Sequence, residues 1–220
     1  MRLLFSFPMP ILLALALNEI TSVRYKKITQ TIIYLPHFIG WVVVYTILQG
    51  FLSQADGIVN QVIVMFGGKK IPFLASEPWF RPVMILSEIW KEAGWGTVVY
   101  LAALAGIDPA IQEAAMIDGA NRWQRIRYIF LPCILSTVTV MLIMRMGTIL
   151  NNGLEQTLLF QNSMNIDVSE VLETYSYSVG LKQGRFAFGT AIGLFQSVVG
   201  CIMVFVSNFI SKKTGGSGLW

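Results

Sequence analysis

Charged side chains are scarce in this sequence. Asp, Glu, Lys and Arg together make up 13% of the residues, against about 25% in an ordinary soluble domain. Apolar residues make up 55% of the chain, and several apolar runs are long enough to cross a bilayer. The composition therefore excludes a soluble domain. It predicts an all-α membrane protein, a polytopic bundle of helices that cross the lipid several times.

Side chains and motifs that carry chemistry are also few. The single histidine, His37, excludes a His-rich metal centre, and Cys133 and Cys201 lie in apolar runs without the spacing of a disulfide framework or a metal site. No Gly-Lys-Ser/Thr phosphate loop, Gly-x-Ser-x-Gly or His-Glu-x-x-His is present. We therefore expect no catalytic residues, no metal site and no ATP bound by this chain. The formal charge of +4 is dispersed and forms no basic patch, which argues against nucleic acid.

Five apolar segments are long enough, or nearly so, to be membrane spans. They cover residues 3–17, 31–52, 82–105, 131–150 and 186–210. Two long polar connections separate them, over residues 53–80 and 151–185. Apolar residues recur at helical spacing over 58–66 and 168–179, which predicts a short helix in each connection, ended by Gly67 and by Gly180.

The third polar connection, residues 106–130, has the pattern of two short helices. Asp108 is a good N-cap, Pro109 suits the first helical position, and Gly119 is typical of a residue just past a helix end. A second helix over 121–129 carries three arginines and is predicted to stop near Pro132. Because neither helix is long enough to be stable alone in water, the pair needs a surface to pack on.

Three short motifs in this connection stand in a fixed order. Glu113-Ala114-Ala115, Asp118-Gly119-Ala120 and Ile129-Phe130-Leu131-Pro132 resemble the EAA loop of binding-protein-dependent ABC importer permeases, which have a MetI-like transmembrane domain. The resemblance implies that the loop is a cytoplasmic coupling helix pair that sits in a cleft of an ATP-hydrolysing subunit. The residues it assigns to this coupling are Glu113, Ala114, Ala115, Asp118, Gly119, Ala120 and Arg122.

The same resemblance implies the partners and the place of the chain. They are a second, homologous permease, two ABC ATPase subunits that bind ATP and Mg, an extracellular or periplasmic solute-binding protein, and the lipid of a bacterial cell membrane. Two alternatives stay open on the residues alone. The helix pair could be an ordinary amphipathic interfacial pair, and the chain could be a non-transport scaffold or small channel that docks another partner.

Orientation follows from the positive-inside rule. One set of span ends carries eight basic residues, including Arg24, Arg122 and Lys213, and the other carries six. This bias places residues 106–130 and the C-terminus in the cytoplasm, and 53–80 and 151–185 outside. Five spans then leave the N-terminus outside, whereas the family usually has one more span upstream. We therefore expect residues 1–220 to form a single transmembrane domain that is incomplete at its N-terminus.

Four charged residues fall inside the predicted spans, and each would cost roughly 2.5–3.5 kcal/mol facing lipid at mid-bilayer. They must face other helices or water. Two interpretations stay open: ion pairing that holds the bundle together, or a polar path for a solute. The candidate path residues are Glu88, Trp90, Lys91, Glu92, Trp95, Arg145 and Asn152. Gly94 and Gly96 could equally be helix-packing positions, and His37 is interpreted as a structural histidine rather than a proton switch.

Several stretches further resemble the carbohydrate-uptake branch of these permeases, in particular the subfamily that takes up oligosaccharides. They are Tyr34-Leu35-Pro36-His37-Phe38, Ile89-Trp90-Lys91-Glu92-Ala93-Gly94-Trp95-Gly96, Tyr100-Leu101-Ala102-Ala103-Leu104 and Gly218-Leu219-Trp220. The resemblance implies a sugar or oligosaccharide as the solute, and the Trp-rich spans fit a sugar chemically.

Overall fold

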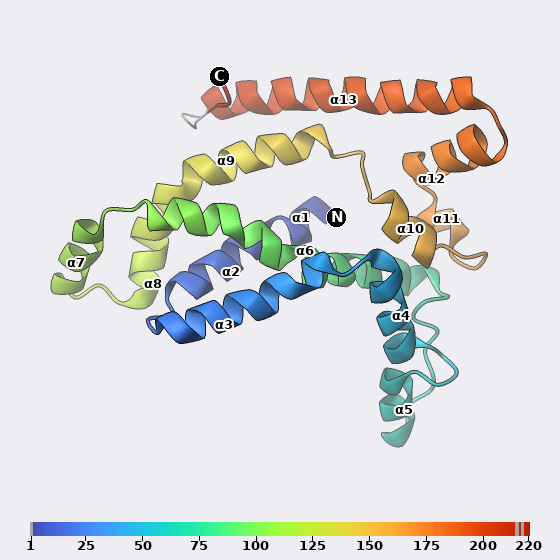
Figure 1. The fold of residues 1–220 in the computed structure, drawn as a ribbon, viewed down its shortest axis with the longest axis horizontal. Coiled ribbons are helices and arrows are strands. Elements are labelled where there is room, and N and C mark those ends of the chain that lie inside the picture. Colours follow the sequence, from blue (N-terminus) through green and yellow to red (C-terminus); the bar gives the residue numbers. More distant parts are fainter. Residues whose placement is uncertain (1, 214–215, 217) are drawn as a thin grey trace. The chain divides into compact units, whose positions relative to one another are not determined.

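The structure, a computed structural model, describes residues 2–213, 216 and 218–220. All regular elements within this part of the chain are helices (Figure 1). The chain divides into two compact units, each built from separate stretches. Unit 1 comprises Met1–His37, Ile89–Thr148 and Gly200–Trp220, and unit 2 comprises Phe38–Glu88 and Ile149–Val199.

Unit 1 contains both ends of the chain and the connection with the EAA-like motifs. Its elements are α1 (Arg2–Ser6), α2 (Pro8–Asn18), α3 (Val23–Tyr34), most of the 3-10 turn η1 (Leu35–Phe38), the second part of α6 (Glu77–Ala105), α7 (Pro109–Ile117), α8 (Arg122–Arg125), the π-helical turn η2 (Ile126–Phe130), α9 (Leu131–Gly147) and the end of α13 (Phe186–Lys213). Its core joins α2, α6, η2 and α9 through buried residues, namely Ala14, Leu15, Tyr100, Leu104, Ile107, Phe130 and Ile134.

Glycines set how closely the helices of unit 1 approach one another. A Cβ added at Gly94 would overlap the carbonyl oxygen of Ile33 on α3, and one added at Gly96 would lie 2.8 Å from Pro10 Cγ on α2. A Cβ on Gly200 of α13 would overlap the carbonyl oxygen of Gly147 on α9. Small residues let helix backbones approach closely in membranes. The interpretation of Gly94 and Gly96 as packing positions is confirmed.

Unit 2 is built from shorter helices. Its elements are α4 (Trp41–Leu52), α5 (Ile58–Met65), the first part of α6, α10 (Leu154–Phe160), α11 (Ile166–Ser169), α12 (Leu172–Ser176), the π-helical turn η3 (Tyr177–Lys182) and the start of α13. Phe80, Val83, Met84 and Phe160 form its core, and the ring of Tyr45 meets that of Phe160 edge-on at 5.0 Å. The predicted helix over 58–66 is confirmed as α5, and Gly67 follows it with φ +80°.

The number of membrane spans predicted from the sequence is not confirmed. By length and composition, two helical segments among the described residues could cross a bilayer alone, Arg122–Gly147 and Phe186–Lys213. Two bent pairs qualify only if each pair counts as one span: Val23–Phe38 with Trp41–Leu52, and Glu77–Ala105 with Pro109–Ile117. The apolar helix Arg2–Asn18 is shorter. The span predicted over 31–52 is not one straight helix, because the chain leaves helical conformation at Ile39 and Gly40 and the two flanking helices meet at 102°.

Two further predictions fail at the π-helical turns. The helix after Asn121 does not stop near Pro132, because the Leu131 N–H bonds to Ile126 C=O and α9 then starts with Pro132 in its first turn, where no N–H is needed. The helix predicted over 168–179 is broken after Ser169. Gly180 does not end it, since Gly180 lies inside η3 and the turn falls at Gly184, φ +73°.

Gly180 serves a different purpose from the predicted one. A Cβ added at Gly180 would lie 3.0 Å from the Cα of Gly189 on α13. The glycine therefore allows η3 to lie directly against the first turn of α13.

Candidate functional site

The connection between α6 and α9 forms the expected helix pair, and local hydrogen bonds shape it. Asp108 Oδ1 accepts from the Ala110 N–H at 2.9 Å, with Pro109 at the first helical position of α7. At the other end Ala120 N–H donates to Ala115 C=O (2.9 Å) and Gly119 N–H to Met116 C=O (3.1 Å). These two hydrogen bonds, with Gly119 at φ +79°, make up a Schellman motif. The predicted N-cap and glycine break are both confirmed.

The start of α8 carries a capping box that the prediction missed. Asn121 Oδ1 accepts from the Gln124 N–H at 2.9 Å, and Gln124 Oε1 accepts from the Asn121 N–H at 2.7 Å. The sequence signal was present, as Asn followed three residues later by Gln. The two caps and the Schellman turn together define where α7 and α8 begin and how the chain turns between them.

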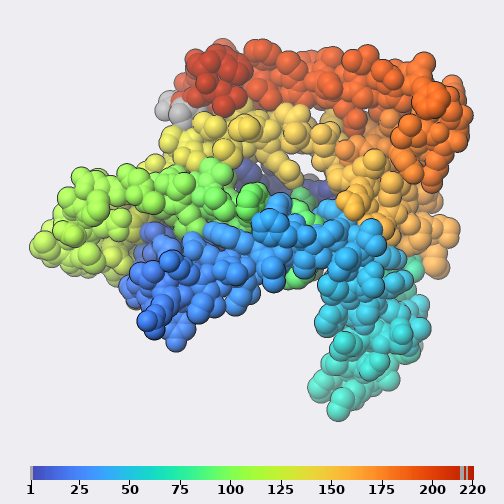
Figure 2. Space-filling model, viewed as in Figure 1, coloured from blue at the N-terminus to red at the C-terminus, as the bar shows by residue number. Residues whose placement is uncertain are grey.

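Most of the predicted coupling residues are accessible on this pair. Glu113, Ala114, Asp118, Gly119 and Arg122 are exposed, whereas Ala115 and Ala120 are partly buried. Glu113 makes no ion pair within the described part of the chain. Figure 2 shows the pair (yellow-green) uncovered at the left edge of the view.

Large apolar side chains are also exposed on and beside the helix pair. Ile117 is 87% exposed and Trp123 79%, and Ile111, Met116 and Tyr128 are exposed as well. A pocket of about 280 Å³ adjoins them, lined by Asp118, Gly119, Ala120, Gln124, Tyr128 and Ile129. Exposed apolar surfaces of this kind mark protein–protein contacts, membrane contacts or ligand-binding grooves.

Gly119 has a conformational role that can be tested. No atom lies within 4 Å of an added Cβ, so only the backbone conformation at φ +79° disfavours other residues there. We expect Gly119→Val to destabilise the turn by about 1–2 kcal/mol, and Gly119→Asn, which tolerates this conformation, to cost less. Thermal melting of the purified subunit in detergent measures the difference. Equal melting temperatures for the Val and Asn variants would contradict this reading.

The charged residues of α6 form a second cluster, which includes a residue outside the predicted path. Glu92 Oε2 lies 2.7 Å from His37 Nδ1, and Glu92 Oε1 accepts from Lys91 Nζ at 3.0 Å. Lys91 Nζ also donates to the His37 carbonyl oxygen at 2.8 Å. The His37 ring stacks on Trp95, with centroids 4.7 Å apart and planes at 5°. The interpretation of His37 as a structural histidine agrees with these contacts.

The structure places the remaining path candidates as follows. Trp90 (49% exposed), Trp95 (46%) and Arg145 lie in unit 1 and are accessible, whereas Lys91 is buried. Glu88 and Asn152 belong to unit 2. Glu88 is buried, and the Asn152 N–H donates to Glu173 Oε2 at 2.7 Å. The structure thus brings Lys91, Glu92 and Trp95 together around His37. A histidine 55 residues away could not be identified as their partner from helical spacing.

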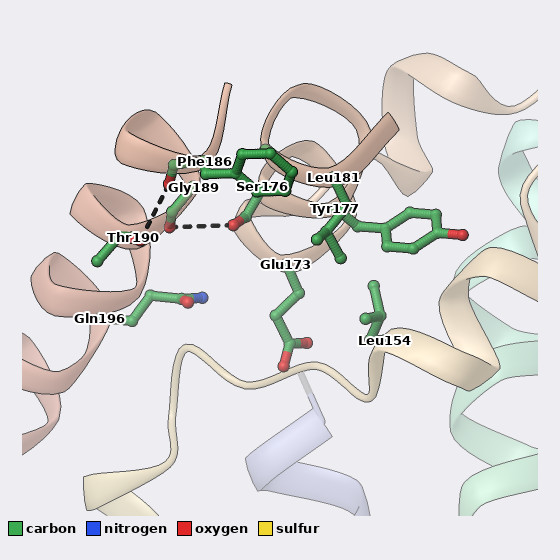
Figure 3. Close-up of a pocket in the computed structure, with 10 residues that line it drawn as sticks. Leu154, Glu173, Ser176, Tyr177, Leu181, Phe186, Gly189, Thr190 and Gln196 are labelled. Carbon is green, nitrogen blue, oxygen red and sulfur yellow. Dashed lines mark hydrogen bonds between the residues drawn. The ribbon is translucent and has the colours of Figure 1, made fainter. Parts of the chain in front are cut away.

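Unit 2 contains a pocket of about 400 Å³ that the sequence did not indicate (Figure 3). Glu173, Tyr177, Phe186 and Gln196 line it together with Leu154, Ser176, Gly180, Leu181, Gly189 and Thr190. The hydroxyls of Ser176 and Thr190 donate to the carbonyl oxygens of Gly189 (3.3 Å) and Phe186 (2.9 Å). The pocket therefore offers one carboxylate and one carboxamide beside aromatic rings. Among the described residues no group of three or more His, Cys, Asp or Glu could hold a metal ion.

Comparison with known proteins decides the class. Residues 6–215 match the family described as "Binding-protein-dependent transport system inner membrane component". The chain belongs to this family. Two curated relatives of this permease come from Bacillus subtilis (strain 168). Protein LplB is 47% identical over 99% of this chain and 69% of its own length. The polygalacturonan/rhamnogalacturonan transport system permease protein YteP is 46% identical over 100% of this chain and 68% of its own length.

Solved structures of the same kind share the fold of this permease. One is a crystal structure of a bacterial alginate ABC transporter in complex with an alginate pentasaccharide-bound periplasmic protein. Its matching chain has a TM-score of 0.93 and 45% identity, covering 99% of this chain and 75% of that one. A second structure, of a bacterial ABC transporter that imports the acidic polysaccharide alginate, matches with a TM-score of 0.91 and 46% identity.

Family membership assigns a transport function to this chain. The chain is a multi-pass permease subunit of an ABC importer, and ATP hydrolysis belongs to a separate subunit. The alternative of a non-transport scaffold or small channel is therefore excluded.

Proposed function

We propose that this permease subunit forms half of the path for an acidic oligosaccharide. The observation that carries the proposal is the kinship with permeases of uronate polymers, namely the rhamnogalacturonan system and the alginate importer at 45% identity. The exposed cation Arg145 on the proposed path suits a solute with carboxylates, since charge-assisted hydrogen bonds are the strong ones. The half-exposed rings of Trp90 and Trp95 offer faces for the C–H groups of sugar rings.

The assembly follows from this assignment. An external solute-binding protein delivers the oligosaccharide to the connections at 53–80 and 151–185. A second, homologous permease completes the path. Two ATPase subunits bind ATP with Mg on the cytoplasmic side, where residues 106–130 and the C-terminus lie, and the membrane is the inner or plasma membrane of a bacterium. The excess of basic residues at the span ends on this side, eight against six, supports this orientation.

Coupling is assigned to the α7–α8 pair, with Glu113, Ala114, Ala115, Asp118, Gly119, Ala120 and Arg122 as its contact residues. The exposed apolar groups of Ile117 and Trp123 support docking on a partner protein. A nucleotide-driven partner can switch the permease only if it binds the two states of the permease unequally. The pair is the exposed, rigid element at which that difference can be exerted.

The solute class is tested with the complete transporter in proteoliposomes, supplied with its binding protein. An acidic oligosaccharide is expected to stimulate ATP hydrolysis, and its methyl-esterified form to stimulate it far less. Arg145→Gln should lower uptake of the acidic form about tenfold or more, because a hydrogen bond to a charged group contributes about 1.5–3 kcal/mol. Lys27→Gln, an exposed cation on α3 outside the proposed path and the two external connections, is the matched control. Equal stimulation by both forms would reject the acidic class and leave the permease function intact.

A further inference from the structure

A carboxylate far from the helix pair in sequence holds α8 in place. Glu19 follows the last residue of α2, and its Oε2 accepts from Arg125 Nη2 at 3.1 Å. Arg122 Nε lies 3.8 Å from the same oxygen. All three residues belong to unit 1. One oxygen of Glu19 therefore meets two arginines of α8.

The contact differs from an ordinary surface ion pair. The side chain of Glu19 is 13% exposed and that of Arg125 16%. Arg125 Nε is also buried, with no hydrogen-bond partner in the described part of the chain. Breaking a buried pair leaves two charges away from water without compensation, which is strongly unfavourable. Separation of α8 from the end of α2 is therefore resisted much more than for an exposed pair.

Apolar packing also joins α2 to the helical segment that continues from α8. Ala14 and Leu15 of α2 share one core with Phe130 and Ile134, and Ile126 and Ile129 of the π-helical turn η2 pack against it. Non-directional packing of this kind allows a helix to rotate or slide. The hydrogen bond that Arg125 donates to Glu19 is directional, and it fixes the position of α8 on that core.

We propose that Glu19 is a positioning residue that keeps α2 and the α7–α8 pair together as one rigid body through the transport cycle. This inference rests on the proposed coupling function of the pair. Movement imposed on α7 and α8 reaches α6 and α9 through the chain itself, because these helices flank the pair in sequence. Through Glu19 the same movement also reaches α2. Glu19 itself contacts neither solute nor ATPase.

Charge reversal tests the role in the reconstituted transporter. Glu19→Arg and Arg125→Glu are each expected to lower solute-stimulated ATP hydrolysis and uptake at least fivefold. The double variant Glu19→Arg/Arg125→Glu, which restores opposite charges, should recover at least half of the activity. Arg24→Glu, an exposed arginine on α3 outside the coupling loop, is the matched control and should change little. A double variant no better than the two single ones would overturn the proposal.

Cross-linking tests whether the two elements stay together. In a background with Cys133→Ala and Cys201→Ala, cysteines at positions 19 and 125 are bridged by a short bifunctional thiol reagent. The unbridged transporter should be impaired, because the two cysteines remove the Glu19–Arg125 bond, and bridging should raise its uptake, because the linker again holds the two elements together. Loss of uptake on bridging, with recovery on cleavage of the linker, would show that the contact must open and would overturn the proposal.

The experiments distinguish failure of the proposed coupling function from failure of the Glu19 inference alone. If Glu113→Arg leaves coupled ATP hydrolysis unchanged, the coupling function of the pair is wrong, and the Glu19 inference falls with it. If Glu113→Arg abolishes coupling while the position 19 and 125 variants behave like wild type, only the Glu19 inference is wrong.

Discussion

Replacement of Glu113 by arginine is expected to abolish solute-stimulated ATP hydrolysis and uptake while leaving the subunit folded. Glu113 is exposed in the middle of α7 and makes no ion pair within the described residues, so its loss should change stability by less than about 0.5 kcal/mol. A like charge placed in an interface costs several kcal/mol, which amounts to well over a tenfold change in the population of the docked state. Hydrolysis and uptake are measured together in proteoliposomes.

Two further variants make the Glu113 test specific. Glu113→Gln removes the charge without reversing it and should give an intermediate loss. Lys27→Glu reverses an exposed charge on α3, outside both the helix pair and the two external connections, and should not uncouple hydrolysis. Unchanged uptake in the Glu113→Arg transporter would remove the helix pair from the coupling mechanism.

The Gly94→Val subunit is expected to fail to fold or assemble normally. A Cβ at this position would overlap the main-chain carbonyl oxygen of Ile33 and lie 2.7 Å from its carbonyl carbon. A side chain could yield by changing its rotamer, but a helix backbone cannot, so α3 would have to move away from α6. Overpacking typically costs about 1–3 kcal/mol and occasionally more, and we expect the upper end here.

The displacement would also reach the charged cluster. His37 follows α3 by three residues, and its contacts with Glu92 and Trp95 depend on the distance between α3 and α6. Thermal melting in detergent and uptake should therefore fall together. Gly193→Ala on α13, where no atom lies within 4 Å of the added Cβ, is the matched control and should gain helix propensity. A Gly94→Val subunit that melts like wild type would contradict the close packing of α3 on α6.

The helix pair was predictable because its signals are local. Asp108, Pro109 and Gly119 act on backbone groups within a few residues, and a capped helix with a left-handed glycine leaves the same pattern in any context. Length and hydrophobicity likewise indicated α13, although it extends to Lys213. The EAA-like spacing added the class of protein, which the family match confirms.

Features that depend on distant partners were missed. Glu19 meets Arg125 across 106 residues, and His37 meets Glu92 across 55, so neither pair leaves a trace in helical spacing. The π-helical turns at Ile126–Phe130 and Tyr177–Lys182 have no sequence signal in propensity or periodicity. The break at Ile39 and Gly40 lay inside an apolar run whose composition alone reads as continuous.

The division of unit 1 among three stretches has a consequence for biosynthesis. Residues Met1–His37 leave the ribosome long before Gly200–Trp220, yet both belong to the same compact unit. Proteins usually fold from the N-terminus onward during translation. The close contact between the backbones at Gly147 and Gly200, however, can form only after Gly200 has been inserted. Unit 1 can therefore be completed only after α13 has entered the bilayer, and a chain that stops before α13 should be degraded by membrane proteases.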